Sequence, residues 1–355
     1  MGAVISIDLM GGDRGPAPLI AGLARVIRKN PDLRFLLYGR ESVVGPLLSR
    51  RPALAERCEL HDCPDEVRMD DKPSETLRRR RDSSMWQAID AVREGRAGVV
   101  VSAGNTGALM AMAVLLLRKA SGVTRPAIAV QWPANRPEAY NIVLDVGADF
   151  RAEPANLAQY AVMGAEYARI SLGLARPRVG LLNLGTEETK GPQALRDAAA
   201  LIEAAAAKDA ARFSFEGFVE GGDLPGNRAD VIVTDGFTGN VAIKTAEGTA
   251  AFIRSSLKTA FRATILSRVA GLFALRALSR LRKRIDPRRV NGGVFLGLNG
   301  AVVKSHGSAD AVGFASAVGL AAKMAAADFS GQVASQLGKL DTGPSGDSTA
   351  GEGGH

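Results

Sequence analysis

Short runs of Val, Ile and Leu alternate along the chain with longer stretches of helical periodicity. Most of the short runs are continuously apolar, as expected of strands that are covered on both faces. They predict strands at Val4–Asp8, Arg34–Tyr38, Gly98–Ser102, Ala127–Trp132, Tyr140–Asp145, Arg178–Asn183, Phe213–Val219, Ala229–Thr234 and Val302–Ser305. The longer stretches predict helices at Pro16–Lys29, Met85–Glu94, Ala108–Arg118, Ala155–Leu172, Pro192–Lys208, Asn240–Leu266 and Ala309–Phe329.

This alternation predicts an α/β fold with a doubly wound, mostly parallel sheet and helices on both faces. The chain of 355 residues is long enough for one large α/β domain or two ordinary ones. No internal repeat is evident, and we assign residues 1–335 to a single domain. Residues 340–355 are rich in Gly, Ser, Asp and Thr without apolar periodicity, which predicts a disordered tail.

One segment carries the excess positive charge. The chain has a net charge of +8, yet residues 252–290 alone hold eleven Lys or Arg against one Asp, which leaves the remainder slightly acidic. Beside a basic row, apolar residues recur at every fourth position: Ile253, Leu257, Phe261, Ile265 and Val269. Residues 250–290 are therefore predicted to form an amphipathic basic helical hairpin, broken at Gly271. Packing in a dimer interface, contact with anionic lipid and nucleic-acid binding all stay open.

Composition argues against several classes of protein. Aromatic residues make up 5% of the chain, too few for stacking platforms that bind single-stranded nucleic acid. The longest apolar stretch, Ala108–Leu117, is about half as long as a membrane-spanning helix, and no signal peptide is visible. Cys58, His61 and Cys63 form a Cys-x2-His-x-Cys pattern, but no fourth ligand stands nearby. We therefore expect free thiols and no metal site.

Gly and small polar or charged residues follow many of the predicted strands. Ligands in a parallel α/β sheet bind at the carboxyl ends of the strands, so we predict that these residues meet at one edge of the sheet. They are Asp8 with Gly11 and Gly12, the turn Ser102–Gly107, the segment Asp145–Asp149, Asn183 with Lys190, the turn Thr234–Asn240, and Lys304 with His306.

The turn Ser102–Gly107 has the features of an anion site. Gly104 and Gly107 permit positive φ and close approach of the backbone. Asn105 and Thr106 offer side-chain donors, and the N–H groups at the start of the next helix face an anion. The pattern is neither a Walker A loop nor Gly-x-Gly-x-x-Gly. It therefore favours phosphate and argues against a dinucleotide-dependent dehydrogenase.

A second turn, Thr234–Asn240, has the same design, with Lys244 further along the next helix. Lys190 and Lys304 add cations, which bind phosphate and stabilise an oxyanion. His306 follows a strand end, where structural and catalytic roles are equally open. The run Arg78-Arg79-Arg80-Arg81 is either a solvated surface or, next to a phosphate site, an attraction for an acidic partner such as an acyl carrier protein.

The chain resembles the PlsX-type phosphate acyltransferases from residue 1 to about 330. The resemblance rests on short motifs that run in the family's order and are specific only together. They are Asp8–Asp13, Met69–Pro73, Asp82–Met85, Ser102–Ala108, Arg125–Ala127, Asp145–Ala148, Leu181–Gly185 with Glu188 and Lys190–Gly191, Asp235–Asn240, and Lys304–Gly307. Asp149 stands where the family usually has Asn, and Ala309 stands where a second Ser often follows.

The resemblance implies transfer of a long-chain fatty acyl group from acyl-acyl carrier protein to orthophosphate. The product, acyl phosphate, would pass to a membrane acyltransferase for phosphatidic acid and phospholipid synthesis. The resemblance also implies a fold like phosphotransacetylases and isocitrate dehydrogenases, a homodimer, no cofactor and no nucleic-acid partner. The enzyme would be cytoplasmic and peripherally bound to the membrane through residues 252–290.

Phosphate is itself an oxyanion nucleophile, so we predict direct attack on the thioester without an acyl-enzyme. Lys190 and His306 are the predicted catalytic residues. The predicted substrate site comprises Asp8, Gly11, Gly12, Ser83, Ser84, Ser102, Gly104, Asn105, Thr106, Gly107, Asn183, Asp235, Thr238, Asn240, Lys244 and Lys304. Two other hypotheses stay open: a short-chain phosphotransacetylase that uses acyl-CoA, and a non-catalytic membrane-surface or scaffold protein.

Overall fold

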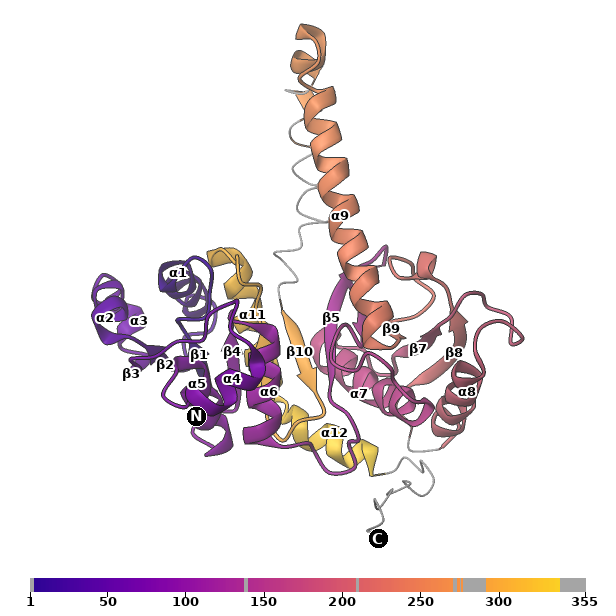
Figure 1. Ribbon diagram of the computed structural model, residues 1–355. Coiled ribbons are helices and arrows are strands. Elements are labelled where there is room, and N and C mark those ends of the chain that lie inside the picture. The colour runs from indigo at the N-terminus through magenta and orange to yellow at the C-terminus, as the bar shows by residue number, and fades with distance from the viewer. Residues whose placement is uncertain are drawn as a thin grey trace, which may run out of the picture.

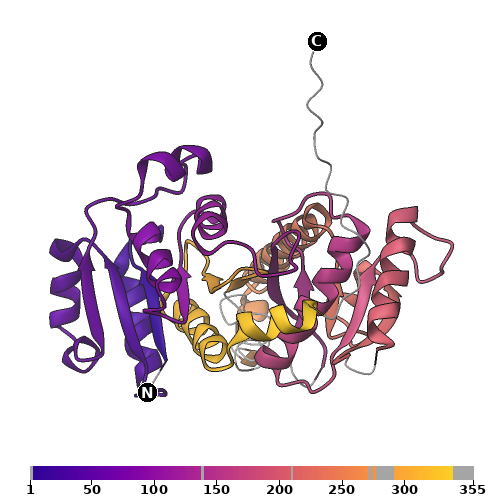
Figure 2. The same ribbon diagram turned by 90° about the horizontal axis from the view of Figure 1, so that it is seen from below.

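The structure, a computed structural model, describes residues 3–136, 140–208, 211–270, 273–274, 276 and 292–338. Strands of this part of the chain form one 11-stranded sheet in the order β3-β2-β1-β4-β11-β10-β5-β6-β9-β7-β8. Helices pack on both faces of the sheet, and β10 lies between its two halves (Figures 1 and 2). The predicted class, a doubly wound and mostly parallel α/β fold, is confirmed.

The strands are β1 (Val4–Asp8), β2 (Arg34–Gly39), β3 (Cys58–Asp62), β4 (Val99–Ser102), β5 (Ala127–Pro133), β6 (Tyr140–Leu144), β7 (Arg178–Leu182), β8 (Ser214–Val219), β9 (Val231–Val233), β10 (Gly293–Leu296) and β11 (Ala301–Lys304). The helices are α1 (Pro16–Ile27), α2 (Glu41–Ser49), α3 (Pro52–Ala55), α4 (Pro73–Arg79), α5 (Ser84–Arg93), α6 (Thr106–Leu117), α7 (Pro154–Leu172), α8 (Gln193–Ala206), α9 (Gly236–Ala260), α11 (Ala311–Ala326) and α12 (Phe329–Leu337), with a 3-10 turn at Gly221–Asp223.

Every strand predicted from the apolar runs is present, but β3, β10 and the helices α2, α3 and α4 were not predicted. The predicted helix Ala309–Phe329 corresponds to α11, and α12 beyond it was not predicted. Between them Asp328 has a left-handed φ of 45°, which interrupts the helical backbone.

The prediction that all the strand ends meet at one edge is wrong in strand direction. β1, β4 and β11 are parallel to one another, and β6, β9 and β7 form a second parallel group. Between the groups, the pairs β11–β10, β10–β5 and β5–β6 are all antiparallel. The two parallel groups therefore run in opposite directions along the sheet. Because β10 is antiparallel to both its neighbours, β11 and β5 run in the same direction, and the reversal occurs at the β5–β6 pair.

Apolar strand residues supply the two cores of the molecule. On one face, Ile5 and Ile7 of β1 are fully buried under α1 and α11. On the other face, Val100 of β4 packs with Ile89 of α5 and Met112 of α6, and all three side chains are buried. Alternate residues of a strand point to opposite faces, so strands buried on both sides must be apolar throughout, as the sequence predicted.

The helix α9 projects away from the body as a long arm (Figure 1). It begins earlier than predicted, at Gly236, and ends at Ala260, after which residues 261–264 form a turn before the chain becomes helical again at 265–270. The predicted break at Gly271, residues 277–290 of the predicted hairpin and the predicted tail at 340–355 lie outside the described residues.

Candidate functional site

The ends of three neighbouring parallel strands bring Asp8, Ser102 and Lys304 into one row. In the pairing of β1 with β4, Asp8 is the partner of Ser102, and in the pairing of β4 with β11, Ser102 is the partner of Lys304. The predicted turn Ser102–Gly107 begins at the middle of this row. Residues from three separate parts of the sequence therefore form a common base for the turn.

Asp8 is buried beneath the turn and organises it. The hydroxyl of Ser84 donates to Oδ1 of Asp8 at 2.7 Å, and the hydroxyl of Ser102 donates to Oδ2 at 2.6 Å. The backbone N–H of Gly104 in turn donates to the Ser102 hydroxyl at 3.0 Å. Burial raises the pKa of the Asp8 carboxyl, while these hydrogen bonds act against the rise. Asp8, Ser84 and Ser102 therefore support the turn from inside, and none of them is open to a ligand.

Two glycines allow the loops after β1 and β4 to touch. A Cβ atom on Gly11 would lie 2.6 Å from both Oδ2 of Asp8 and Cα of Gly104. A Cβ atom on Gly104 would lie 2.4 Å from the end of the Met85 side chain. The contact at Gly11 is with backbone and is shorter than real Cβ contacts, so glycine is required there, whereas at Gly104 the flexible end of Met85 would have to move. Gly12, the next residue, has ordinary space around it.

The side chain of Asn105 is used within the protein. Its Oδ1 accepts from the N–H of Ala108 at 3.1 Å and so caps α6, as is usual for Asn at this position. Its Nδ2 donates to the carbonyls of Met69 at 3.0 Å and Asp71 at 2.9 Å. That Asn105 binds the substrate stays a prediction; in this structure its side chain caps α6 and holds the 69–71 backbone.

The backbone of the turn keeps two donors for a ligand. Because the N–H of Ala108 is capped, the N–H groups of Thr106 and Gly107 are those left at the start of α6, and the described residues offer them no acceptor. Both residues are exposed. These two N–H groups, together with the positive end of the helix dipole, are suited to an anion.

Lys304 brings a cation to the same place. Its Nζ donates to the carbonyl of Ser305 and lies 3.4 Å from the carbonyl of Ala103, inside the turn. Burial lowers the pKa of this amine to about 8, although Asp13 and Asp8 act in the opposite direction. An ammonium with so little water around it interacts more strongly with an anion than a surface lysine does.

His306 follows directly in the loop after β11. Its Nδ1 accepts from the backbone N–H of Ser308 at 3.2 Å and contacts the Ser308 hydroxyl at 2.9 Å. A nitrogen that accepts an N–H carries no proton, so the neutral ring is protonated on Nε2. The loop is joined to the loop after β1, since the N–H of Asp13 donates to the carbonyl of Gly307 at 3.0 Å.

The second predicted turn, Thr234–Asn240, leaves fewer N–H groups free at the start of its helix than the turn Ser102–Gly107 does. The carboxylate of Asp235 caps α9, accepting from the N–H of Thr238 at 2.8 Å and from its hydroxyl at 2.9 Å. The N–H of Gly236 donates to the carbonyl of Asp149 at 2.8 Å. A negative charge of the protein itself thus occupies the start of this helix, which makes the turn less suited to an anion than the neutral Asn105 turn.

Other predicted residues hold this second group together. Asn240 donates to the carbonyl of Val146 at 3.1 Å, and the buried Asp145 accepts from the N–H of Asp149 at 2.6 Å. The carboxylate of Asp149 itself is held by the hydroxyl of Tyr160 at 2.9 Å and by Asn156 at 3.1 Å. Lys244 lies exposed on α9.

Lys190 lies in the loop after β7, within the second parallel group. Its Nζ is 2.8 Å from Oε1 of Glu187, and both side chains are more than half exposed. The carboxylate of Glu187 raises the pKa of Lys190. Asn183 folds this loop by donating to the carbonyl of Lys190 at 3.0 Å.

Two parts of the site were not predicted, namely Asp13 and the backbone of Met69–Asp71. Both stretches occur in the family motifs, but only the contacts in the folded protein show what they do.

Ser83 has a structural contact as well, since its hydroxyl accepts from the N–H of Trp86 at 3.3 Å and caps α5.

In the Cys-x2-His-x-Cys stretch, Cys58 and Cys63 are free thiols, and the His61 ring stacks on Tyr38 with a centroid distance of 4.8 Å. Within the described residues, no group of three possible ligands could hold a metal ion.

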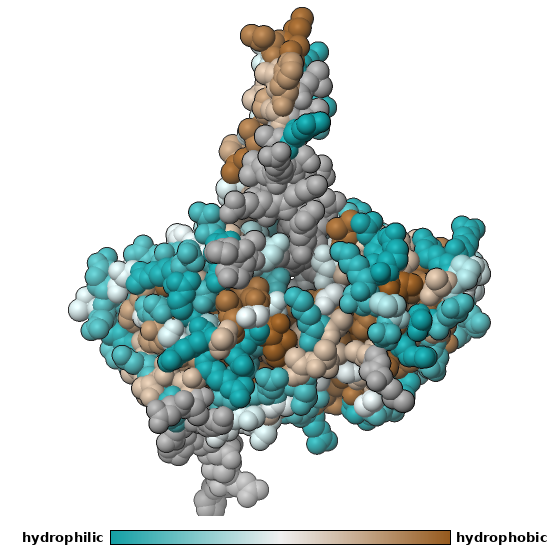
Figure 3. Space-filling model, turned by 180° about the vertical axis from the view of Figure 1, so that it is seen from behind, coloured by the Kyte–Doolittle hydropathy of each residue, from teal (hydrophilic) through white to brown (hydrophobic). Residues whose placement is uncertain are grey.

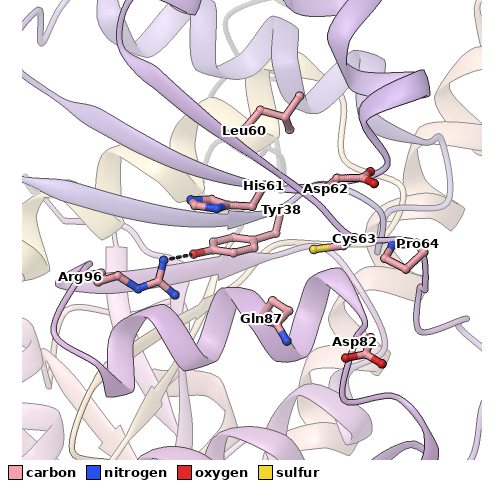
Figure 4. Close-up of a pocket in the computed structure, with 9 residues that line it drawn as sticks. All are labelled: Tyr38, Leu60, His61, Asp62, Cys63, Pro64, Asp82, Gln87 and Arg96. Carbon is pink, nitrogen blue, oxygen red and sulfur yellow. Dashed lines mark hydrogen bonds between the residues drawn. The ribbon is translucent and has the colours of Figure 1, made fainter.

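A pocket of about 590 Å³ opens at the β2–β3 edge of the sheet (Figure 4). Arg96 donates to the hydroxyl of Tyr38 at 3.0 Å on one side of it, and Asp62 and Asp82 lie on the other. Its lining contains none of the predicted site residues. The site at the ends of β1, β4 and β11 is therefore a surface turn and not this pocket.

The fold and the turn place the protein in a known structural class. It is similar to EutD phosphotransacetylase from Staphylococcus aureus, with a TM-score of 0.60 and 16% identity over 91% of this chain and 94% of that one. It is also similar to a phosphotransacetylase from Streptococcus pyogenes, with a TM-score of 0.61 and 15% identity over 92% and 94% of the two chains. At this identity the likeness concerns the fold alone.

The sequence defines the family more narrowly. Residues 3–332 match the profile of the family described as "Fatty acid synthesis protein". A relative from Jannaschia sp., named "Phosphate acyltransferase", is 57% identical over 342 residues, which are 96% of this chain and 93% of the relative. The chain therefore belongs to this family, that of the PlsX-type phosphate acyltransferases, and it is an acyltransferase, as its motifs indicated.

Proposed function

We propose that the protein transfers a long-chain fatty acyl group reversibly from acyl-acyl carrier protein to orthophosphate, and so makes acyl phosphate for phosphatidic acid synthesis. The observation that carries this proposal is the pair of free N–H groups on Thr106 and Gly107, with the ammonium of Lys304 from the neighbouring strand at the base of the turn. Two backbone donors and one cation match the charge and the acceptor oxygens of phosphate.

In the proposed reaction, the turn and Lys304 hold phosphate while one of its oxygens attacks the thioester carbonyl. The new C–O bond forms as the C–S bond breaks, and the carrier thiolate leaves and takes up a proton. His306, in the loop that follows Lys304, is assigned to proton transfer or to stabilisation of the carbonyl oxygen as it becomes negative. The protein contributes position and charge, since phosphate is already a nucleophile and needs no acyl-enzyme.

The direct test is incubation of the protein with long-chain acyl-acyl carrier protein and labelled orthophosphate. We expect labelled acyl phosphate, trapped by hydroxylamine as the hydroxamate, together with free carrier thiol in equal amount. Loss of thioester without phosphate dependence would indicate a hydrolase, and no loss at all would favour a scaffold protein. Either result contradicts the proposal.

The fold itself favours a second candidate, a short-chain phosphotransacetylase that uses acyl-CoA. Competition between the two donors decides between them. Under the first proposal, long-chain acyl-acyl carrier protein is turned over with much the higher kcat/KM, and excess acetyl-CoA does not reduce its use. The reverse preference would establish the second candidate.

We further propose that the enzyme is a cytoplasmic homodimer that contacts the membrane peripherally through the α9 arm and residues up to 290. Along the arm, Phe252 is 71% exposed and Ile253 is 49% exposed, next to Arg254 and Lys258. Figure 3 shows apolar side chains at the outer end of the arm. Apolar and basic residues on one projecting element fit an anionic lipid surface. Among the described helices, none is by itself both long and apolar enough to cross a bilayer.

A further inference from the structure

A group of exposed cations lies on α4 and on the loops at its two ends. The group, which we term the α4 surface, consists of Arg68, Lys72, Arg78, Arg79 and Arg81. The remaining member of the arginine run, Arg80, is only partly exposed and lies 2.5 Å from Asp65 and 3.7 Å from Asp71. Arg80 thus fastens the segment to the protein, and its neighbours do not.

The cations of the α4 surface have no stabilising role that would account for them. Within the described residues none of them forms an ion pair, and Arg81 only lies over the ring of Trp86, 5.7 Å from its centroid. The exposed cations outnumber the exposed acids of the same stretch, Asp70, Glu75 and Asp82. The exposed Met69 adds an apolar contact beside them. A basic surface with an apolar residue beside it suits an acidic protein partner.

The α4 surface is attached directly to the anion-binding turn. Asn105 of the turn donates to the carbonyls of Met69 and Asp71, and it also lies 3.4 Å from the carbonyl of Arg68. At the start of α4, Pro73 packs against Gly107. A Cβ atom on Gly107 would lie only 2.9 Å from Cγ of Pro73. Any partner on this surface is therefore placed beside the N–H groups of Thr106 and Gly107.

We propose that the α4 surface is the docking site for the acidic carrier protein that brings the acyl thioester, and that the Asn105 tether holds it in register with the turn. The proposal rests on the proposed function, because it assumes a protein-bound donor. Docking there delivers a thioester on a flexible arm to the turn. Long-range attraction between opposite charges would speed the encounter and weaken with added salt.

The test compares two acyl donors that share the thioester but differ in the carrier. In the variant Arg78→Glu/Arg79→Glu/Arg81→Glu, we expect kcat/KM for acyl-acyl carrier protein to fall by about tenfold or more, through KM. With the acyl thioester of pantetheine, which has no protein part, kcat/KM should change by less than about twofold. The matched control, Arg25→Glu/Arg28→Glu/Lys29→Glu, makes the same change of charge on exposed residues at the end of α1 and should leave both donors unaffected.

Each other outcome has a definite meaning. An equal loss with both donors means damage to the site and overturns docking, and so does an unchanged rate with the carrier protein. A protein that turns over neither donor before mutation contradicts the proposed function itself. The native enzyme gives a second measurement that needs no folded variant. Its kcat/KM for the carrier-bound donor should fall as salt is raised from about 0.05 M to about 0.3 M, and a flat profile overturns the proposal.

Discussion

The hydroxyl of Ser102 donates to Oδ2 of the buried Asp8 at 2.6 Å, across two neighbouring parallel strands. The same hydroxyl accepts from the N–H of Gly104 at 3.0 Å. One side chain therefore links a buried carboxylate to the backbone of the anion-binding turn. Among the described residues, this is the hydrogen-bonded link between Asp8 and Gly104, so we expect the position of the turn to depend on it.

Replacing Ser102 by Ala tests this link. The change deprives Asp8 of one donor and leaves the buried N–H of Gly104 without an acceptor, so we expect the free energy of unfolding to fall by about 1–3 kcal/mol. Chemical denaturation measures it. Ser49→Ala, which removes an exposed hydroxyl that donates to Pro46 at 3.1 Å, should change stability by less than about 0.5 kcal/mol. Equal effects of the two substitutions would show that the Asp8 network carries no special weight.

The activity should depend on pH through Lys304. Burial lowers the pKa of its amine to about 8, and the proposed site uses the protonated form. We therefore expect the KM for phosphate to rise as pH increases through about 8, in a range where phosphate remains the dianion. In Lys304→Gln the KM should be high and independent of pH over the same range. A pH profile shared by the native enzyme and this variant would remove Lys304 from phosphate binding.

The same pKa has a consequence for stability. Because the folded-state pKa is below the ordinary value of 10.5, the unfolded chain binds more protons than the folded protein between about pH 8 and this value. The contribution of Lys304 to the free energy of unfolding must therefore rise with pH in this window and stay constant below it. Denaturation of the native protein and of Lys304→Gln at pH 7.5 and pH 9.5 measures this contribution: the free energy of unfolding of the native protein minus that of the variant should be larger at pH 9.5.

The side chain of Asn105 caps α6 through its oxygen and holds the 69–71 backbone through its nitrogen, and two substitutions distinguish these roles. Asn105→Asp keeps an oxygen to cap α6, but it loses the donations to the 69–71 backbone and adds a negative charge at the turn. We expect the KM for phosphate to increase by about tenfold or more, with little change in helix stability. Asn105→Ala should instead destabilise the protein by about 1 kcal/mol through loss of the cap. An unchanged KM in Asn105→Asp would place the phosphate away from this turn.

The sequence was sufficient to predict the class of fold and the turn, because both depend on local patterns. Continuous apolar runs follow from burial on both faces, and Gly104 and Asn105 lie next to each other in the chain. It was not sufficient to predict β3 and β10. The strand β3 alternates between polar and apolar residues at the edge of the sheet, and β10 is a four-residue strand that follows the basic segment. Their pairing depends on partners far away in the sequence.

The antiparallel pairing of β5 with β6 explains why the strand ends do not all meet at one edge of the sheet. Both strands were predicted, but apolar runs do not show the direction in which two strands pair. The β5–β6 pair turns the strand before Lys190 opposite to the strand that ends at Lys304. Composition also does not reveal which polar side chains are already used. Asp235 and Asn105 hold equivalent positions before a helix, yet the first fills the helix start with its own charge and the second leaves N–H groups open.

The exposed apolar row of α9 allows a last prediction, on membrane contact. Ile253→Glu removes an apolar side chain from the arm and adds a charge that anionic lipid repels, so binding to vesicles containing phosphatidylglycerol should weaken by about tenfold or more. Vesicle co-sedimentation measures it. Val43→Glu, on an exposed site of α2 far from the arm in Figure 1, is the matched control and should bind as the native protein does. Unchanged vesicle binding by Ile253→Glu, together with dissociation of the dimer in analytical ultracentrifugation, would assign the row to the subunit interface instead.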